Sequence, residues 1–449
     1  MSENQKKSEL PAVKYRAITA VKGPLIFVQA VPNVGLGELV KIHLAQETRT
    51  GQVLEIRENL CIIQVLEGTR GISQETAVSF TGEPAKLSVS TEMLGRVFDG
   101  RGRPIDGGPS IRSSLEMEVS GKPLNPVARA YPKDFIETGI SALDCCLSLV
   151  RGQKLPIFSG GGLPHSDLAA QIVRQSHVLE SEEKFTVVLS AIGITQEEAN
   201  FFIRDFRQAE VMNRTVMFMN LADDPVIERL LSPRLALTCA EFLAYSENYH
   251  VLVLLLDMTN YCEALREISM ARGEIPGRGG YPGYMYTDLA SIYERAGRVA
   301  NRKGSITLVP ILSMPDYDIT HPIPDVTGFI TEGQIVLSQD LSKRGVYPPI
   351  DILPSLSRLM KEGVGEGRTR ADHIDISDEI YRFYSMGRNA MDLVLVIGED
   401  ALTRDETKRL QFARRLENEF INQGKYERRD IEDTLNLGSN MLNKLKEGE

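Results

Sequence analysis

Near-continuous apolar runs separated by amphipathic stretches constrain the fold of this chain most. The runs are Phe185–Ile194, Arg214–Ala222 and the segment HVLVLLLD that begins at His250, and a helical pattern follows each of the first two. Strands that are apolar along their whole length are typical of parallel strands covered by helices on both faces. The sequence therefore predicts an α/β domain with a parallel sheet, whose ligands bind beyond the carboxyl ends of the strands.

A strand, a glycine-rich turn and an amphipathic helix follow one another over residues 155–175, LPIFSGGGLPHSDLAAQIVRQ. This is the outline of a phosphate-binding loop (P-loop), in which backbone N–H groups hold phosphates, a Lys contacts the β and γ oxygens and a hydroxyl holds Mg²⁺. Alignment on the helix start places Pro164 at the second Gly, His165 at the Lys and Ser166 at the hydroxyl. Proline lacks the N–H donor, and a neutral imidazole does not replace an ammonium group.

Two interpretations of this stretch remain open: a plain glycine-rich loop without a ligand, and a P-loop fold that has lost its own chemistry. The rest of the chain favours the second interpretation. We expect the residues of the degenerate loop to be non-functional in nucleotide binding; they are Gly160, Gly161, Gly162, His165 and Ser166.

The segments on either side of the α/β domain have different patterns. Residues 1–13 are polar and predict a disordered tail, and short β runs separated by turn residues over 14–83 predict a β-barrel. Barrels of this size can bind oligonucleotides, but aromatic and basic residues are not interleaved here, so an assembly collar is favoured. The α/β domain is expected to span 84–359, with a glycine-rich linking loop at Leu94–Pro109.

The chain becomes helical and charged over residues 360–449. We expect helices around Arg370–Gly387, Ala401–Gln423 and Ile431–Leu445, with their charges on solvated faces. The predicted fold class is therefore multidomain α/β, with an N-terminal β-barrel, a central P-loop-type domain with a parallel sheet and a C-terminal helical bundle.

Composition excludes several functions. The net charge of −10 and the isoelectric point near 5.4 argue against a partner such as nucleic acid or an anionic membrane surface. The longest apolar run, Val251–Leu256, is too short to span a bilayer. The five cysteines lack CxxC spacing and indicate reduced thiols, and the histidines form no zinc-binding pattern, so no metal site is expected in this chain.

Two further features allow two interpretations each. Asp257 follows the apolar run, where the Mg²⁺-handling carboxylate of a P-loop enzyme belongs, but an Asp at a strand end is more often a helix N-cap. The Pro/Gly-rich stretch Pro276–Tyr284 is either a plain connector or a contact surface, and the helix TDLASIYERAGR is expected to follow it.

Several long blocks, in order along the chain, resemble the non-catalytic B subunit of V/A-type rotary ATPases. They are LVRGQKLPIFSGGGLPH (149–165), NLADDPVIERL (220–230), EALREISMARGEIPGRGGYPGYMYTDLASIYERAGR (263–298), THPIPDVTGFITEGQI (320–335) and PPIDILPSLSRLM (348–360). The resemblance implies a β-barrel collar, a RecA-like nucleotide-binding domain and a helical bundle. It also implies a ring in which three B subunits alternate with three catalytic A subunits, with central and peripheral stalk subunits as further partners. Such a ring is the head of a proton- or sodium-driven machine, attached indirectly to the cytoplasmic side of the cell membrane.

The resemblance also implies site residues. Catalytic relatives carry a water-activating Glu in a G-E-R-x-x-E run, and Ile194 occupies its place here, where an alkyl group accepts no proton. Arg358 matches the arginine finger that reaches the γ-phosphate of ATP in the adjacent A subunit, so that ATP or ADP with Mg would be held mainly by the partner. Without the flanking signature, Arg358 would read as a surface salt-bridge residue.

Secondary positions follow from the same match. Ser355 and Ser357 are expected to shape the turn that aims Arg358, and Arg272 is a weaker nucleotide-site candidate. The loop implied to face the central stalk contributes partner contacts through Arg278, Tyr281, Pro282 and Gly283. Family members usually have a second Arg where this chain has Gly279, so the charge of the loop is lower here.

Two other functions are alternatives to a regulatory subunit. An autonomous hexameric motor, such as a secretion ATPase or an RNA translocase, would share the fold but needs an intact G-x-x-x-x-G-K-[ST], which is absent. A pure scaffold would use neither the loop nor Arg358. We expect this chain to be catalytically inactive alone and to bind no nucleotide tightly.

Overall fold

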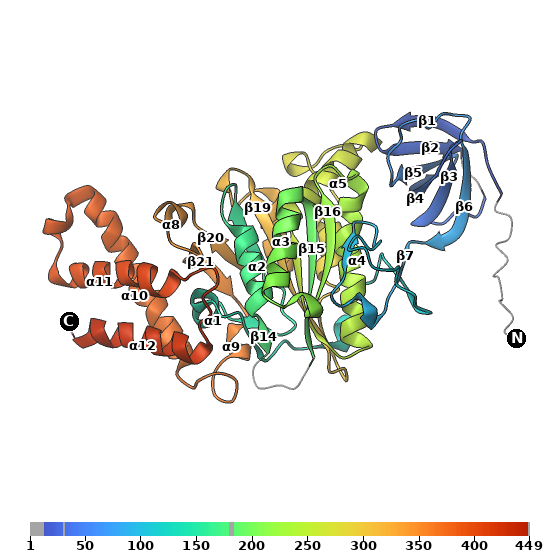
Figure 1. Ribbon diagram of the computed structural model, residues 1–449. Coiled ribbons are helices and arrows are strands. Elements are labelled where there is room, and N and C mark those ends of the chain that lie inside the picture. The colour runs from blue at the N-terminus through green and yellow to red at the C-terminus, as the bar shows by residue number, and fades with distance from the viewer. Residues whose placement is uncertain (1–12, 30–31, 179–183, 448–449) are drawn as a thin grey trace, which may run out of the picture.

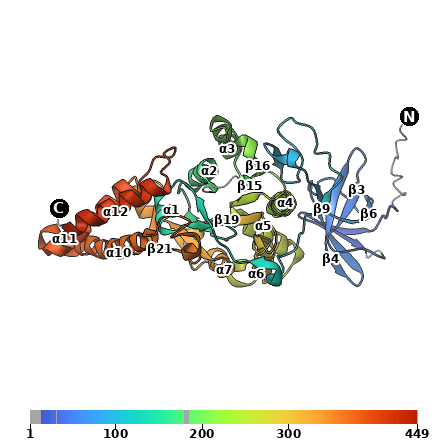
Figure 2. The same ribbon diagram turned by 90° about the horizontal axis from the view of Figure 1, so that it is seen from below.

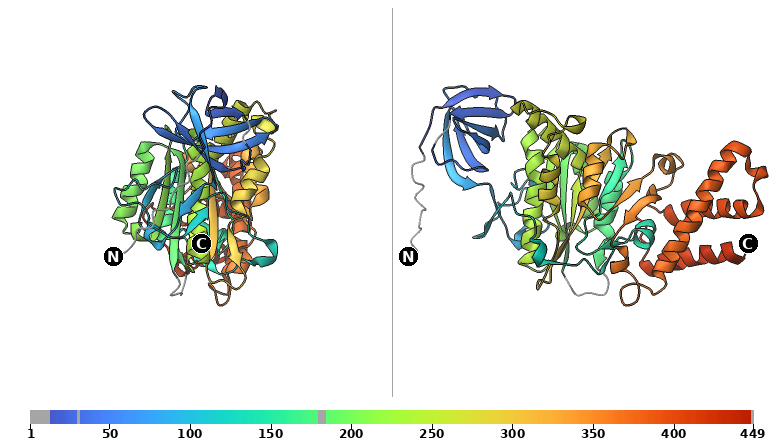
Figure 3. Two further views of the ribbon diagram at one scale, coloured as in Figure 1. Left: turned by 90° about the vertical axis from the view of Figure 1, so that its right-hand side faces the viewer. Right: turned by 180° about the vertical axis from the view of Figure 1, so that it is seen from behind.

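A computed structural model describes residues 13–29, 32–178 and 184–447 of the chain. Most of the predicted tail, 1–13, lies outside the described residues. The three parts follow one another along an elongated molecule, with the barrel at one end and the C-terminal helices at the other (Figures 1 and 3). The predicted architecture of barrel, α/β domain and helical bundle is confirmed.

The N-terminal sheet closes into a barrel. Its strands are β1 (Ile18–Lys22), β2 (Leu25–Gln29), β3 (Glu38–His43), β4 (Thr48–Arg57), β5 (Leu60–Val65) and β6 (Ala77–Pro84), and they are ordered β1-β2-β5-β4-β3-β6. Tyr15, just before β1, exchanges two backbone hydrogen bonds of 2.8 Å with Val78 of β6, which joins the two edges. Alternate side chains point inward and form the barrel core, among them Ile26, Val28, Val40, Ile42, Val53, Ile63 and Val65.

The central sheet is the predicted parallel sheet. Its strands are β8 (Val97–Asp99), β13 (Ile157–Gly160), β15 (Phe185–Ile194), β16 (Thr215–Leu221), β17 (His250–Leu256), β19 (Ser305–Met314), β20 (Gly333–Leu337) and β21 (Ile350–Ser357), and they are ordered β21-β20-β13-β19-β17-β15-β16-β8. All pairs on this path are parallel except β20–β21, which is antiparallel. Every residue of β17 is buried, as its unbroken apolar run predicts.

The expectation of a linking loop at Leu94–Pro109 is wrong in one respect. Residues Val97–Asp99 form β8, which pairs with β16 at the edge of the sheet. Val97 and Phe98 are both 1% exposed, so the strand has an apolar anchor. It is three residues long and is flanked by glycines, which is too short a run for a periodicity argument to detect.

Helices cover both faces of the sheet (Figure 2). α2 (His165–Gln175) and α3 (Gln196–Gln208) pack on one face, while α4 (Val226–Tyr245), α5 (Met258–Arg272) and α6 (Met285–Tyr293) pack on the other. α3 begins at a capping box between Thr195 and Glu198, in which each side chain accepts a hydrogen bond from the backbone of the other. The shorter helices are α1 (Ser141–Cys146), α7 (Pro322–Ile330), α8 (Gln339–Lys343) and α9 (Met360–Gly363).

The predicted helix TDLASIYERAGR ends earlier than expected, because its last residues serve other elements. α6 ends at Tyr293, and Gly297–Val299 form strand β18, which pairs with β10 (Arg129–Ala130) and with β19. Arg295, between them, is fully buried and forms an ion pair with Glu241 of α4 at 2.7 Å. The remaining short strands are β7 (Lys86–Ser88), β9 (Glu116–Glu118), β11 (Phe135–Glu137), β12 (Leu149–Val150) and β14 (His177–Val178).

The C-terminal domain is a bundle of α10 (His373–Ile397), α11 (Arg404–Arg415), which continues as a π-helix over Leu416–Ile421, and α12 (Ile431–Glu447). Buried apolar residues from each of these helices join the same core that extends under α2. In the described part of the chain, none of the helices combines the length and the apolar character that crossing a bilayer requires.

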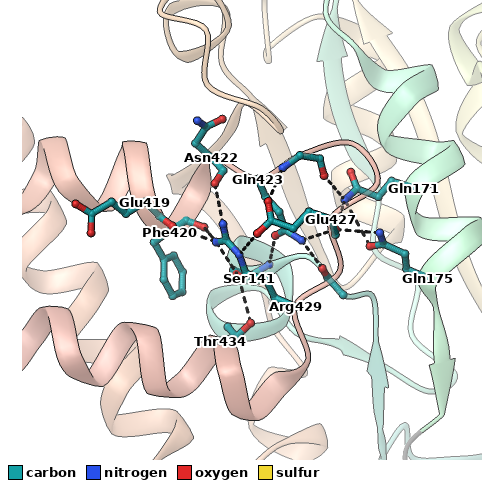
Figure 4. Close-up of polar contacts among 12 residues, drawn as sticks. Ser141, Gln171, Gln175, Glu419, Phe420, Asn422, Gln423, Glu427, Arg429 and Thr434 are labelled. Carbon is teal, nitrogen blue, oxygen red and sulfur yellow. Dashed lines mark hydrogen bonds and ion pairs between the residues drawn. The ribbon is translucent and has the colours of Figure 1, made fainter.

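The segment 422–430, which we call the clasp, attaches this bundle to the central domain (Figure 4). Gln423 is 3% exposed; its Nε2 donates to the Gly139 carbonyl at 2.7 Å and its Oε1 accepts from the Ser141 N–H at 3.1 Å. Gln171 and Gln175 of α2 donate to the carbonyl of Glu427 at 3.2 and 3.0 Å. The clasp therefore connects the helical bundle directly to α2, the helix that follows the glycine-rich turn.

Candidate functional site

The glycine-rich turn lies between β13 and α2, as the sequence predicts, but an aromatic ring of the same chain covers it. Tyr317 follows β19, the neighbour of β13, and its hydroxyl donates to the carbonyl of Gly161. A Cβ atom placed on Gly160 would lie 2.1 Å from Cε1 of Tyr317, so only glycine allows this approach. The absence of a side chain at Gly160 therefore makes room for Tyr317.

The start of α2 also differs from a phosphate site. The His165 imidazole, at the Lys position, has its Nδ1 3.2 Å from the Ser159 hydroxyl. The Ser166 hydroxyl, at the Mg²⁺ position, donates to the Glu198 carboxylate at 3.1 Å. Pro164 is the N-cap and has no side-chain cap hydrogen bond. With no lysine, an engaged hydroxyl and a tyrosine over the loop, these residues do not fit a nucleotide phosphate.

The carboxyl ends of β15 and β17 carry the two other positions of interest. Ile194 ends β15 and is 4% exposed, so the carboxyl end of this strand carries an apolar side chain and no carboxylate. Asp257 follows β17 and accepts a hydrogen bond from the Thr259 N–H at 2.8 Å, which caps α5. Its other oxygen accepts from the Ser313 hydroxyl at 2.6 Å. Asp257 is therefore the N-cap of α5, in agreement with the second of its two interpretations.

Across the residues that the structure describes, no group of three or more His, Cys, Asp or Glu side chains is arranged to hold a metal ion.

Arg358 and the glycine-rich turn lie at opposite ends of the strands of the central sheet. β13 and β20 run parallel, and β21 runs back along β20, so that Gly333 pairs with Ser357. The end of β21 therefore lies where β13 begins, whereas the turn follows the end of β13. Arg358 cannot serve the turn of its own chain.

The Arg358 side chain is exposed, and its guanidinium has no polar partner among the described residues. Its backbone N–H donates to the carbonyl of Glu332 at 3.0 Å. Within the described residues its guanidinium makes no hydrogen bond and no ion pair. The described residues therefore offer no carboxylate partner for the alternative interpretation, in which Arg358 forms a surface salt bridge. An exposed, permanently charged fork of donors at the edge of a sheet is available to an anion outside this subunit.

Ser355 and Ser357 fix the backbone that leads to Arg358. Ser355 is 6% exposed; its hydroxyl donates to the Asp351 carbonyl at 2.5 Å and accepts from the Val336 N–H at 2.9 Å. Ser357 is 8% exposed; its hydroxyl donates to the Ser148 carbonyl and accepts from the Gln153 side chain, both at 3.0 Å. Sequence reasoning did not identify Gln153 because it lies 204 residues from Ser357 and no local pattern marks it.

Arg272 lies away from these groups. It pairs with Glu274 at 3.1 Å and lines a cavity of about 240 Å³ between the barrel and the central domain, together with Gln64 and Leu54 of the barrel. Gln64 is fully buried, and neither polar atom of its amide has a hydrogen-bond partner among the described residues. The position of Arg272 is that of an interdomain residue.

The loop that begins at Pro276 is exposed only in part. Arg278 is exposed, pairs with Asp325 at 2.6 Å and donates to the Thr320 carbonyl at 2.6 Å. Gly283 is also exposed, but Tyr281 and Pro282 are buried. The Tyr281 hydroxyl donates to Glu263 at 2.5 Å, and burial is the first cause of the raised pKa of Tyr281. Of the four residues expected to contact a partner, Arg278 and Gly283 are therefore exposed in this subunit, whereas Tyr281 and Pro282 anchor the loop.

Comparison with known proteins covers all three parts of the chain. Residues 139–357 match the ATP synthase alpha/beta family, nucleotide-binding domain; residues 18–82 match the beta-barrel domain of the same family; and residues 362–449 match the C-terminal domain of V and A type ATP synthase. Among solved structures, the ATP synthase subunit NeqB from Nanoarcheaum equitans is similar, with 40% sequence identity and a TM-score of 0.76. The match covers 94% of this chain and 99% of that one. The chain therefore belongs to the ATP synthase alpha/beta family and is a subunit of the V/A type.

Proposed function

We propose that this chain is the non-catalytic, regulatory B subunit of a V/A-type ATP synthase or ATPase. It alternates with catalytic A subunits in a ring and supplies Arg358 to the nucleotide site of the neighbouring A subunit. The observation that carries the proposal is the contrast between the two ends of neighbouring strands. At the carboxyl end of β13 the chain's own loop is covered by Tyr317, and at the opposite end Arg358 is exposed without a partner in the described residues.

Transfer of a phosphoryl group builds negative charge on oxygen atoms, and a guanidinium stabilises this charge with a planar fork of donors. Arginine fingers contribute roughly 10³–10⁵ in rate, which corresponds to about 4–7 kcal/mol. ATP or ADP with Mg would be held by the A subunit, because the loop of this chain does not fit a phosphate. The role of Arg358 is then to complete a site that it does not itself build.

The remaining parts of the proposal concern the assembly. The barrel would join its neighbours in a collar, and Arg278 and Gly283 would present the exposed side of their loop to central stalk subunits. Peripheral stalk subunits would attach the head to membrane subunits that carry protons or sodium ions, so that this chain lies on the cytoplasmic side of the cell membrane as a peripheral component. Family membership and the V/A-type C-terminal domain support this arrangement.

The test is a ring assembled from this chain and its A subunit, with Arg358→Ala or Arg358→Lys in this chain. Both rings should assemble with normal mass by native mass spectrometry, because the guanidinium makes no hydrogen bond or ion pair within the described residues that its loss would break. ATP turnover should fall by roughly 10³ or more with Ala, and Lys should restore little, because it keeps the charge but not the fork.

A matched control is Arg368→Ala, which removes another exposed arginine from the same region of the chain and should leave turnover unchanged. The purified chain alone should not hydrolyse ATP. Near-normal turnover in the Arg358→Ala ring would refute the finger, and vigorous hydrolysis by the chain alone would refute the regulatory role.

A further inference from the structure

Gln153 is a fully buried amide at the base of the central sheet, just before β13. It is 0% exposed. Its Oε1 accepts from the Val150 N–H at 3.0 Å, and its Nε2 donates to the Glu332 carbonyl at 3.2 Å and to the Ser357 hydroxyl at 3.0 Å. Donor and acceptor atoms of the amide are therefore both engaged, and its orientation is fixed.

The two groups that Gln153 contacts through Nε2 are the groups that hold Arg358 in place along the backbone. Ser357 immediately precedes Arg358, and its hydroxyl also donates to the Ser148 carbonyl at 3.0 Å. The Glu332 carbonyl accepts the backbone N–H of Arg358 at 3.0 Å. Gln153 thus connects Ser357, the last residue of β21, with the Glu332 carbonyl that accepts the backbone N–H of Arg358. It forms no hydrogen bond with the Arg358 guanidinium.

Glu332 is itself held on both its backbone and its side chain. Its N–H donates to the Lys154 carbonyl at 2.9 Å, and its carboxylate accepts from the Lys154 N–H at 2.7 Å. The Lys154 ammonium, whose side chain is 4% exposed, pairs with Glu332 at 3.0 Å and with Glu294 at 2.7 Å. Gln153 and Lys154 therefore form, with Glu332, a frame beside the end of β21, an edge strand whose one strand partner among the described residues is β20.

We propose that Gln153 is a positioning residue for Arg358. By holding Ser357 and the Glu332 carbonyl together, it fixes the direction in which the Arg358 side chain leaves the sheet. A group that stabilises developing charge must be placed to within a fraction of an ångström, so a small displacement of its backbone reduces its effect steeply. This inference rests on the proposed function of Arg358, and it adds a residue that acts only through Arg358.

The test uses Gln153→Met in the assembled ring, since Met fills a similar volume without polar atoms. Gln334→Met is the matched control, because Gln334 also donates from its amide to β21, at the Pro354 carbonyl (3.0 Å), but away from Arg358. We expect kcat for ATP to fall by about tenfold to a hundredfold in Gln153→Met, with KM for ATP unchanged, and to be unaffected in the control.

A second measurement does not depend on turnover. Binding of ADP with aluminium fluoride, which mimics the transferring phosphoryl group, should weaken in the Gln153→Met ring by a similar factor, while binding of ADP alone should not change. If Met at this position prevents folding, Ser357→Ala removes the same hydrogen bond from the other side and should give the same pattern with a smaller loss.

The Arg358→Ala background separates positioning from general stability. In single-turnover assays with labelled ATP, Gln153→Met should cause no further loss once Arg358 is absent. An equal loss in both backgrounds, or unchanged kcat and unchanged binding of the fluoride complex in the single variant, overturns the inference. Full activity of the Arg358→Ala ring is a different result, because it refutes the proposed function and the inference with it.

Discussion

The substitution Gly160→Ala tests whether Tyr317 occupies the glycine-rich turn. An added Cβ would lie 2.1 Å from Cε1 of Tyr317, 2.3 Å from Cδ1 and 2.9 Å from Cζ, whereas ordinary contacts begin at 3.4 Å. The ring would have to move by more than an ångström. That movement would also break the hydrogen bond from the Tyr317 hydroxyl to the Gly161 carbonyl.

The expected cost follows from these two effects. A neutral hydrogen bond contributes about 1 kcal/mol, and overpacking by one methyl group costs roughly 1–3 kcal/mol. Tyr317 is 36% exposed and can swing outward, so we expect a total of about 1–3 kcal/mol rather than the sum of the upper values. For a domain of this size, that lowers the melting temperature by roughly 2–10 °C.

The assay is differential scanning calorimetry of the full chain, read at the transition that contains the central domain. Gly161→Ala is the control: a Cβ there meets nothing within 4 Å and the backbone is not left-handed, so stability should not fall. Tyr317→Ala should make Gly160→Ala nearly harmless. If the two substitutions lower the free energy of unfolding additively, Tyr317 does not lie over Gly160, and the account of the filled loop is wrong.

Two further predictions concern buried ionisable side chains. His373 is fully buried, with Nε2 3.0 Å from the Cys145 carbonyl, and burial lowers its pKa below the ordinary value of 6.5. The unfolded chain therefore takes up a proton as the pH falls through 6.5 while the folded chain resists it, so stability is lost on acidification. The melting temperature of the wild type should drop more than that of His373→Gln between about pH 7.5 and 5.5, and parallel curves would contradict this. Arg295→Met should destabilise the central domain by about 3–5 kcal/mol in calorimetry, because it leaves Glu241 largely buried and unpaired. Adding Glu241→Gln should recover part of that loss, and an Arg295→Met chain as stable as wild type would show that the pair contributes nothing.

The regular elements of the central domain were predictable because their signals are local. β15 spans the residues that its apolar run marks, and α3 begins where Thr195 and Glu198 form a capping box. β8 was missed because a strand of three residues has no period to detect. The early end of α6 was missed because its cause is the pairing of β18 with β10 and β19.

The residues that the site lacks could be predicted from the sequence, but the contacts between its side chains could not. The missing lysine and Ile194 are visible in the sequence, and the role proposed for Arg358 came from the family resemblance. The hydrogen bond from Tyr317 to Gly161 and the one from the Gln153 amide to Ser357 join residues 156 and 204 positions apart, respectively, and no local pattern encodes either contact. The same limit explains why Tyr281 was expected at the surface, since its burial depends on Glu263 and His321.

The clasp has a mechanical consequence. Its carbonyl groups accept hydrogen bonds from α2, and the Gln423 side chain forms hydrogen bonds with the backbone of Gly139 and Ser141. These bonds restrict rotation of the bundle relative to the central sheet. A torque applied at the far end of α10 and α11 is therefore delivered to the base of α2 and to the strands beneath it. In this subunit the bundle behaves as a stiff arm of the central domain rather than as a separately jointed part.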